Sequence, residues 1–367
     1  MHDVIVVGGG VVGASAAYRC TQHGARTLLI DAHHFGRATD AGAGIVSPET
    51  ELRDRSPNRL LAEASARFYP ELIAELQATG ASDTGYSRCG KLIIARDDRE
   101  AEWLGAYLGL LLDPARPGTV PEGISEISPE SARARFPLLG PVTRAAWSRD
   151  AARVDGRLLA AALIETSVAR GLEIERATVD HFVLDDGAVR AVVAGRAIDA
   201  ERVILAGGAW SAALARDIGV RLDLHPQRGQ IAHLAIDDPA SEQWPVVSPL
   251  AEHYLLAFPG RIVAGATHED EAAFDARVTA AGTAQVLADA LSVAPGLAGA
   301  TLLEMRAGLR PVATRGHPYL GAVPAVAGLF VAVGHGASGL TYGPWSAAQV
   351  ADAALGEPHA DLSAFAV

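Results

Sequence analysis

Residues 4–13 read Val-Ile-Val-Val-Gly-Gly-Gly-Val-Val-Gly, an apolar run that passes directly into glycines. An Ala-rich segment over residues 11–23 follows, and a second apolar run over residues 27–30 leads to Asp31. Short runs of β-branched residues favour buried strands, whereas Ala favours helix. The pattern therefore predicts a strand, a glycine turn, a helix and a second strand that ends in an acid.

The spaced glycines give this unit a specific chemistry. Gly8 allows a sharp turn after the strand, Gly10 leaves room for a pyrophosphate beside the backbone, and Gly13 allows close packing of the helix on the strand. The helix N-terminus adds N–H groups that bind phosphate. Asp31 lies about 20 residues farther on, where a carboxylate accepts hydrogen bonds from ribose hydroxyls. We predict a dinucleotide site; the alternative is an ordinary βαβ unit with chance glycines.

The composition excludes several other classes of protein. With 367 residues, 49% of them hydrophobic and 20% charged, the chain has enough apolar side chains for more than one domain. A net charge of −12 without a basic stripe argues against nucleic-acid binding. Cys20 and Cys89 lack metal or redox spacing, so we expect reduced thiols, no metal and a cytoplasmic protein.

One long segment needs separate treatment. Residues 316–351 contain no Asp, Glu, Lys or Arg, which by itself suggests a membrane span. Pro318, Pro324, Pro344 and many glycines interrupt it, so we expect a buried strand, a glycine loop and a helix instead. No leader is expected, because the first apolar run belongs to the nucleotide-binding unit.

Hydrophobic periodicity and turn residues predict the remaining elements. Helices are expected over residues 57–79, 98–112, 155–170 and 276–293, with another that begins at Ser128-Pro129. Strands are expected over residues 89–95, 172–184, 188–198, 203–211, 229–236, 245–266 and 328–333.

Three glycine-rich strand ends are far apart in the sequence, at residues 8–13, 207–208 and 334–339. We expect them to converge on one ligand in a discontinuous nucleotide domain, although each is also explained as a simple strand-to-helix turn. We expect other residues that line the pocket to come mostly from residues 50–60 and 225–260.

Taken together, several segments resemble the flavin-dependent superfamily of D-amino-acid oxidase, glycine oxidase and sarcosine oxidase. The matching segments are Val4–Gly13, Ala38–Pro48, Val203–Ser211, Pro226–Ile231, Ala307–Pro311 and Gly334–Gly339. The resemblance implies FAD rather than NAD. It also implies an α/β fold, α+β overall. One domain would be a Rossmann-type FAD-binding domain of glutathione-reductase-like type, and the substrate domain would be built on a mixed or antiparallel sheet. The FAD-binding domain would comprise residues 1–85, 146–222 and 300–367, and the substrate domain residues 86–145 and 223–299.

The resemblance also implies which residues contact FAD, from the adenosine to the flavin. Asp31 and Ala32 would lie at the ribose, and Val179 on the adenine side. The pyrophosphate and helix N-terminus would involve Gly8, Gly10, Val11, Val12, Gly13, Thr39, Asp40, Ala41 and Gly42. Ala43, Gly44 and Ile45 would pass the flavin ring, and Gly207, Gly208 and Trp210 would close the cleft. The flavin N1–C2 carbonyl edge would face Gly334, His335, Gly336, Ala337, Ser338, Gly339, Leu340 and Thr341, a helix N-terminus that stabilises its negative charge.

Two further residues are implied for the substrate. Arg310, in the Gly-Leu-Arg-Pro segment, would bind a substrate carboxylate, since a guanidinium pairs with a carboxylate through two parallel hydrogen bonds. Tyr254 would bond the same carboxylate. The alternatives are a structural ion pair for Arg310 and a half-buried strand aromatic for Tyr254. Arg228 is interpreted as a hinge or structural contact.

The chain departs from parts of the superfamily pattern. The loop Gly336–Gly339 lacks the second arginine that glycine oxidases tend to carry there. Neither cysteine is placed like the flavin-bonded cysteine of sarcosine oxidases, and residues 38–47 contain no histidine. We therefore predict non-covalent FAD.

The implied reaction oxidises the amine carbon of a small amino acid: a D-amino acid, glycine or an N-alkyl amino acid. Hydride passes to flavin N5, the imino acid hydrolyses to a keto acid, and O2 is the expected acceptor, giving H2O2. A quinone-linked D-amino-acid dehydrogenase of the same fold remains open, as does an amine oxidase for a substrate without a carboxylate. A non-catalytic nucleotide-binding protein is a third alternative. An NAD-dependent reductase is disfavoured, because the glycines at 207–208 and 334–339 would then have no role. A homo-oligomer is possible.

Overall fold

The computed structural model describes residues 2–47, 57–81, 83–111, 123–250 and 253–367. Its first sheet has the strand order β17-β18-β11-β1-β2-β8, with β10 beside β11 and β9 beside β10. The central strands β8, β2, β1, β11 and β18 are parallel, and β17 is antiparallel. These strands are β1 (His2–Val7), β2 (Thr27–Ile30), β8 (Glu173–Glu175), β9 (His181–Asp185), β10 (Ala188–Val193), β11 (Ala197–Leu205), β17 (Tyr319–Ala322) and β18 (Leu329–Val333).

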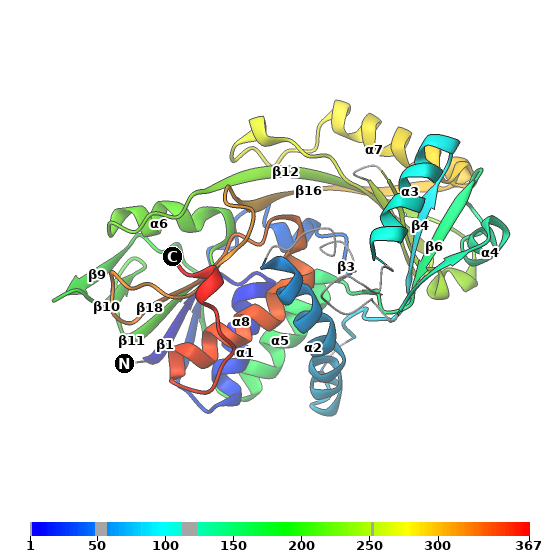
Figure 1. Ribbon diagram of the computed structural model, residues 1–367. Coiled ribbons are helices and arrows are strands. Elements are labelled where there is room, and N and C mark those ends of the chain that lie inside the picture. Colours follow the sequence, from blue (N-terminus) through cyan, green and yellow to red (C-terminus); the bar gives the residue numbers. More distant parts are fainter. Residues whose placement is uncertain (1, 48–56, 82, 112–122, 251–252) are drawn as a thin grey trace.

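Helices cover one face of this sheet side by side (Figure 1): α1 (Val11–Gln22), α2 (Asn58–Ala78), α5 (Gly156–Ala169) and α8 (Gly339–Leu355). Small residues such as Ala16 and Ala347 are fully buried between them, which allows close helix packing. The Rossmann-type α/β arrangement expected from the resemblance is confirmed. No helix among the described ranges is long and apolar enough to span a membrane.

The second sheet has the order β16-β12-β15-β14-β13-β4-β6-β5 and is mainly antiparallel. Its strands are β4 (Lys91–Ala95), β5 (Ile124–Ile127), β6 (Arg144–Ser148), β12 (Leu224–Ala235), β13 (Val246–Pro249), β14 (Tyr254–Phe258), β15 (Arg261–Gly265) and β16 (Thr301–Ala313). The helices α3 (Asp98–Leu111), α4 (Pro129–Arg135) and α7 (Ala280–Val293) lie at this end of the molecule (Figure 1). A small sheet of β3 (Ile45–Val46) and β7 (Ala152–Arg153) lies against α8, which β3 contacts.

The long strands β12 and β16 extend across both parts of the molecule (Figure 1). Near Arg310 they contact the short helices η1 (Ala38–Ala41), η3 (Gly208–Trp210) and η7 (Gly336–Ser338), and their far ends pack in the second sheet. The domain division remains a proposal. The sequence boundary at 300 would place β16 in the FAD-binding domain, and the boundary at 146 would split β6. Because both strands pair within the second sheet, we propose to assign them to the substrate domain.

Several element boundaries predicted from the sequence were wrong. The expected strand 172–184 is divided into β8 and β9, and the segment between them includes Ala177 and Val179, which line a cavity. The expected strand 188–198 ends at Val193, where a turn with Gly195 at φ +69° leads into β11. The helix expected over 276–293 begins at Ala280, because the Thr279 side chain accepts a hydrogen bond from the Gly282 N–H and caps it.

A buried carboxylate joins the two central helices. Asp352 of α8 is 2% exposed and accepts hydrogen bonds from Arg19 of α1 at 2.7 and 3.1 Å. His23 Nε2 lies 2.9 Å from the same carboxylate. These contacts hold α1 against α8 at the helix ends remote from the glycine turns.

We expect Asp352→Ala to lower the free energy of unfolding by about 2 kcal/mol, because the paired hydrogen bonds to Arg19 are lost in a buried site. Thermal or urea unfolding of the purified protein measures this. Asp185→Ala, which removes an exposed carboxylate 3.6 Å from Arg190, is the control and should leave the unfolding midpoint unchanged. Equal midpoints for both variants would contradict the role of Asp352.

Candidate functional site

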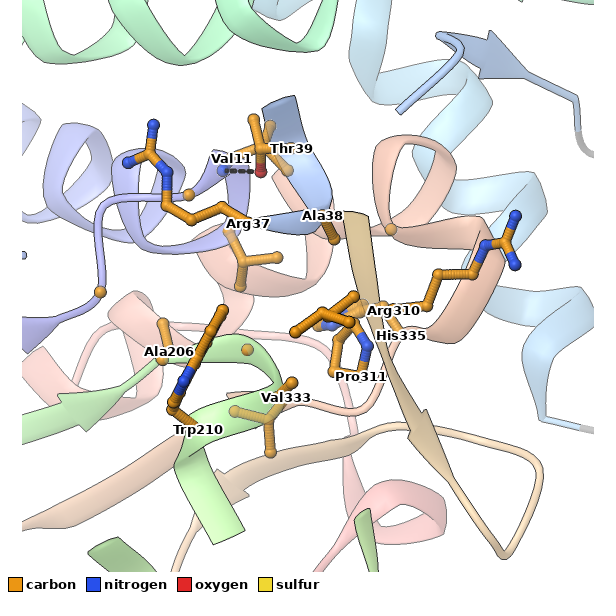
Figure 2. A pocket seen from close by; sticks show the side chains of 18 of the residues that line it. Val11, Arg37, Ala38, Thr39, Ala206, Trp210, Arg310, Pro311, Val333 and His335 are labelled. Atoms are coloured by element: carbon orange, nitrogen blue, oxygen red, sulfur yellow. Dashed lines mark hydrogen bonds between the residues drawn. The ribbon is translucent and has the colours of Figure 1, made fainter. Parts of the chain in front are cut away.

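A cavity of about 720 Å³ lies where the two sheets meet, within the range typical of small-molecule and cofactor sites. All three glycine-rich strand ends predicted from the sequence line it, with residues 8–10, 207–208 and 336–339 among the lining. In Figure 2, the side chains of Arg37 and Arg310 extend toward opposite sides of this cavity. The convergence expected from the sequence is confirmed, and it requires the discontinuous chain path described above.

The first turn has a shape that only glycine allows. Gly8 has φ +106°, and a Cβ there would lie 2.5 Å from the Ala206 carbonyl oxygen. A Cβ on Gly13 would lie 1.8 Å from the Gly8 carbonyl oxygen. These close approaches place the start of α1 directly behind β1, and the N-terminus of α1 faces the cavity.

The same turn fits the phosphates of a dinucleotide. Gly10 precedes α1 and provides no side-chain cap, and no acidic residue lies in the first turn of the helix. The Val11 N–H donates to Thr39 Oγ1 at 2.9 Å, which fixes η1 beside the helix N-terminus (Figure 2). A helix N-terminus without a competing carboxylate attracts phosphate. The residues present therefore fit the pyrophosphate of FAD.

The acid at the end of β2 lies in a polar corner of the cavity. Arg37 Nη1 donates to Asp31 Oδ2 at 2.8 Å, and the same guanidinium donates twice to Asp40 at 3.0 Å. The His34 ring stacks on Trp210 with centroids 4.7 Å apart. Asp31 thus has a partner that holds it at the cavity wall, where a ribose would place its hydroxyls.

Nearly all of the predicted cofactor residues line this cavity. Those that do are Gly8, Gly10, Val11, Val12, Asp31, Ala32, Thr39, Ala41, Gly42, Ala43, Gly44, Ile45, Val179, Gly207, Gly208, Trp210, His335, Gly336, Ala337, Ser338, Gly339, Leu340 and Thr341. Gly13, Asp40 and Gly334 are not part of the lining. Gly13 packs behind the turn, Asp40 binds Arg37, and Gly334 has φ +88° ahead of His335, so each of the three supports a residue that does line it.

The structure adds lining residues that sequence reasoning missed. Arg37, His34 and His268 supply polar groups, and Gly229 and Gly308 supply space on β12 and β16. The two strand glycines carried a usable signal, because glycine inside a strand often marks a close approach. The three polar residues carried no such signal in the sequence, since their position depends on how distant segments pack. Of the expected lining stretch 50–60, residues 50–56 lie outside the described ranges.

Arg310 and Tyr254 lie at the other side of the cavity, opposite Arg37. Arg310 Nη1 donates to Gln227 Oε1 at 3.0 Å and to the Thr267 carbonyl at 2.9 Å. A Cβ on Gly229 would lie 2.4 Å from Arg310 Nη2, so the guanidinium rests over a residue without a side chain. Similarly, a Cβ on Gly265 would lie 2.8 Å from the Tyr254 hydroxyl. Burial raises the pKa of the Tyr254 phenol more than nearby Arg310 lowers it, so the hydroxyl keeps its proton.

His335 is a neutral group in the cavity wall. His335 Nε2 lies 2.8 Å from Ser346 Oγ, and the same hydroxyl lies 3.2 Å from the Gly343 carbonyl oxygen. Burial lowers the pKa of this imidazole to about 4. His335 is therefore neutral across the physiological range.

Metal binding and cysteine chemistry receive no support from the described part of the chain. No group of three His, Cys, Asp or Glu side chains there is arranged to bind a metal. Both cysteines are buried and neither lines the cavity, and burial raises the pKa of the Cys20 thiol to about 12.

Comparison with known proteins agrees with this geometry. A family described as FAD dependent oxidoreductase matches residues 3–353. The chain belongs to this family. It is 39% identical to an uncharacterised oxidoreductase, YurR, of Bacillus subtilis, over 100% of this chain and 98% of that one. It is 31% identical to a glycine oxidase of Pseudomonas putida, over 99% and 98%.

Solved structures show the same relationship. The iminodiacetate oxidase IdaA from Chelativorans sp. BNC1 superposes with a TM-score of 0.91 at 38% identity, covering 99% of this chain and 98% of that one. The glycine oxidase from Geobacillus kaustophilus gives a TM-score of 0.88 at 28% identity, covering 100% and 98%. The protein is thus an FAD-dependent oxidoreductase of the glycine oxidase and iminodiacetate oxidase type.

We expect Gly13→Ala to purify with little FAD and a lowered thermal midpoint, because the new methyl group would displace α1 from the turn that faces the phosphates. Flavin absorbance per protein and thermal unfolding measure the two effects. Gly109→Ala is the matched control, since a Cβ there meets nothing within 4 Å and Ala favours helix. Normal FAD content in Gly13→Ala would contradict the proposed cradle.

Proposed function

We propose that this enzyme oxidises the amine carbon of a small, carboxylated amine. One observation carries the proposal: a guanidinium, Arg310, and a protonated phenol, Tyr254, line the same cavity as the glycine turns. The turns fit a pyrophosphate, whereas Arg310 and Tyr254 fit an anion of the size of a carboxylate. The cavity therefore has one end for the cofactor and one for an acid.

Each proposed substrate residue has a distinct part in binding. Arg310 pairs with the carboxylate through charge-assisted hydrogen bonds, and Tyr254 donates a further bond to it. Fixing the carboxylate also fixes the adjacent amine carbon, which is catalysis by positioning. When bound, FAD supplies the two-electron acceptor for the hydride of that carbon. Burial keeps the Tyr254 phenol protonated, so it adds no negative charge beside Arg310, and burial keeps the His335 imidazole uncharged.

Within this class we favour N-substituted glycines, with iminodiacetate as the first compound to test, ahead of glycine itself. The 38% identity to the iminodiacetate oxidase supports this, compared with 31% to a glycine oxidase. The loop Gly336–Gly339 also lacks the arginine that the glycine oxidase pattern expects. We propose non-covalent FAD, a substrate ammonium group that loses one proton to give the free amine before oxidation, and O2 as the acceptor with release of H2O2.

We expect Arg310→Leu to raise KM strongly and to lower kcat/KM at least about a hundredfold, since a buried charged hydrogen bond is worth about 3 kcal/mol. Oxygen uptake and peroxide release with iminodiacetate, sarcosine, glycine and D-alanine measure this. Arg306→Leu is the control, because Arg306 lies on the same strand, bonds Glu304 and does not line the cavity. Near-normal kinetics of Arg310→Leu would exclude the carboxylate assignment. Reduction of the flavin by a substrate without oxygen uptake would favour the quinone-linked alternative.

A further inference from the structure

Among the described residues, two acceptors of different kinds bond the guanidinium of Arg310. One is the backbone carbonyl of Thr267, which is fixed because Thr267 is 1% exposed and its hydroxyl bonds both Gln230 N–H and Glu269. The other is the side-chain amide oxygen of Gln227, the residue directly opposite Arg310 in the β12–β16 pairing. The backbone carbonyl can only accept a hydrogen bond, whereas the side-chain amide can present either an acceptor or a donor.

A glutamine amide has an acceptor end and a donor end, and rotation by half a turn exchanges them. In the flipped state, Gln227 would present its NH2 group to the N–H of Arg310, and the hydrogen bond would be lost. The orientation observed here depends on the second partner of the amide. Gln227 Nε2 donates to Asp270 Oδ1 at 2.8 Å. An ionised carboxylate only accepts, so it selects the orientation in which Oε1 faces Arg310.

Asp270 is suited to remain ionised in this position. Hydrogen bonds from Gln227 and His225 lower the pKa of its carboxyl below the usual value. Its side chain is 61% exposed, so the fold does not depend on it for packing. Asp270 itself does not line the cavity, and it reaches Arg310 through Gln227.

We propose that Asp270 is a positioning residue for substrate binding, acting on Arg310 through the amide of Gln227. The inference rests on the proposed function, in which Arg310 binds the substrate carboxylate. The chain Asp270–Gln227–Arg310 orients the guanidinium before substrate arrives, which reduces the ordering cost of binding.

The test compares four holoenzyme variants with the wild type: Asp270→Ala, Asp270→Asn, Gln227→Leu and the double variant Asp270→Ala/Gln227→Leu. Acetate, a carboxylate without an amine, is titrated into each, and its Kd is read from the perturbation of the flavin absorbance. KM and kcat are measured with the best substrate of the wild type. Glu271→Ala is the matched control, because it removes one exposed negative charge from the next position of the same short helix, η5 (Asp270–Ala272).

We expect Asp270→Ala and Gln227→Leu each to raise the Kd of acetate and the KM about five- to twentyfold, as for loss of one hydrogen bond to a charged group, with kcat changed less. Asp270→Asn, which still offers an acceptor, should remain within about twofold of the wild type. Because Asp270 acts only through Gln227, the double variant should equal Gln227→Leu.

Different results would overturn the inference. If Asp270→Ala and Glu271→Ala behave alike, the effect is general electrostatics; if the effects of Asp270→Ala and Gln227→Leu add in the double variant, Asp270 does not act through the amide. Either result leaves the proposed function intact provided that Arg310→Leu abolishes acetate binding. If Arg310→Leu binds acetate like the wild type, the proposed function fails and the inference fails with it.

Discussion

The antiparallel pairing of β12 with β16 is the constraint on which the rest of the site depends. The pairing runs from Leu224–Ala313 to Ala235–Thr301 with one register shift between His233 and Leu234, and it joins the second sheet to the glycine turns of the first. It places Arg310 opposite Gln227 and brings the guanidinium within reach of the Thr267 carbonyl. A change in register by one residue would turn Arg310 to the opposite face of the sheet.

Glycines determine the shape of the site at both ends of the cavity, for different reasons. At the cofactor end, Gly8 and Gly13 allow backbone to approach backbone, so that a helix N-terminus faces the cavity. At the end that we propose for the substrate, Gly229 and Gly265 leave space for the side chains of Arg310 and Tyr254 on neighbouring strands. The polar groups provide the chemistry, and the missing Cβ atoms allow them to occupy their positions.

Local sequence was enough to predict the nucleotide-binding unit, because the turn from Gly8 to Gly13 and the strand that leads to Asp31 depend on residues close in the chain. It also predicted a helix that begins at Ser128-Pro129, and in the structure the Ser128 side chain caps α4 there. The partners Arg37, Gln227 and Asp270 were missed, because their roles arise from contacts between segments that only tertiary packing brings together. The strand boundaries near Val179 failed for a related reason: that segment follows the cavity wall instead of continuing the ladder. The assignment of individual residues to FAD and substrate remains a prediction.

The central claim is that one cavity holds FAD and a carboxylate-bearing amine. The most direct measurement is an anaerobic titration of the holoenzyme, followed by the visible flavin absorbance, with matched amines that differ only in the carboxylate: sarcosine against dimethylamine, and glycine against methylamine, with iminodiacetate alongside. The account predicts that the carboxylated member of at least one pair, or iminodiacetate, bleaches the flavin and that the amines without a carboxylate leave it oxidised. Equal bleaching by an amine and its carboxylated counterpart would contradict the role of Arg310 and show that the carboxylate is not recognised.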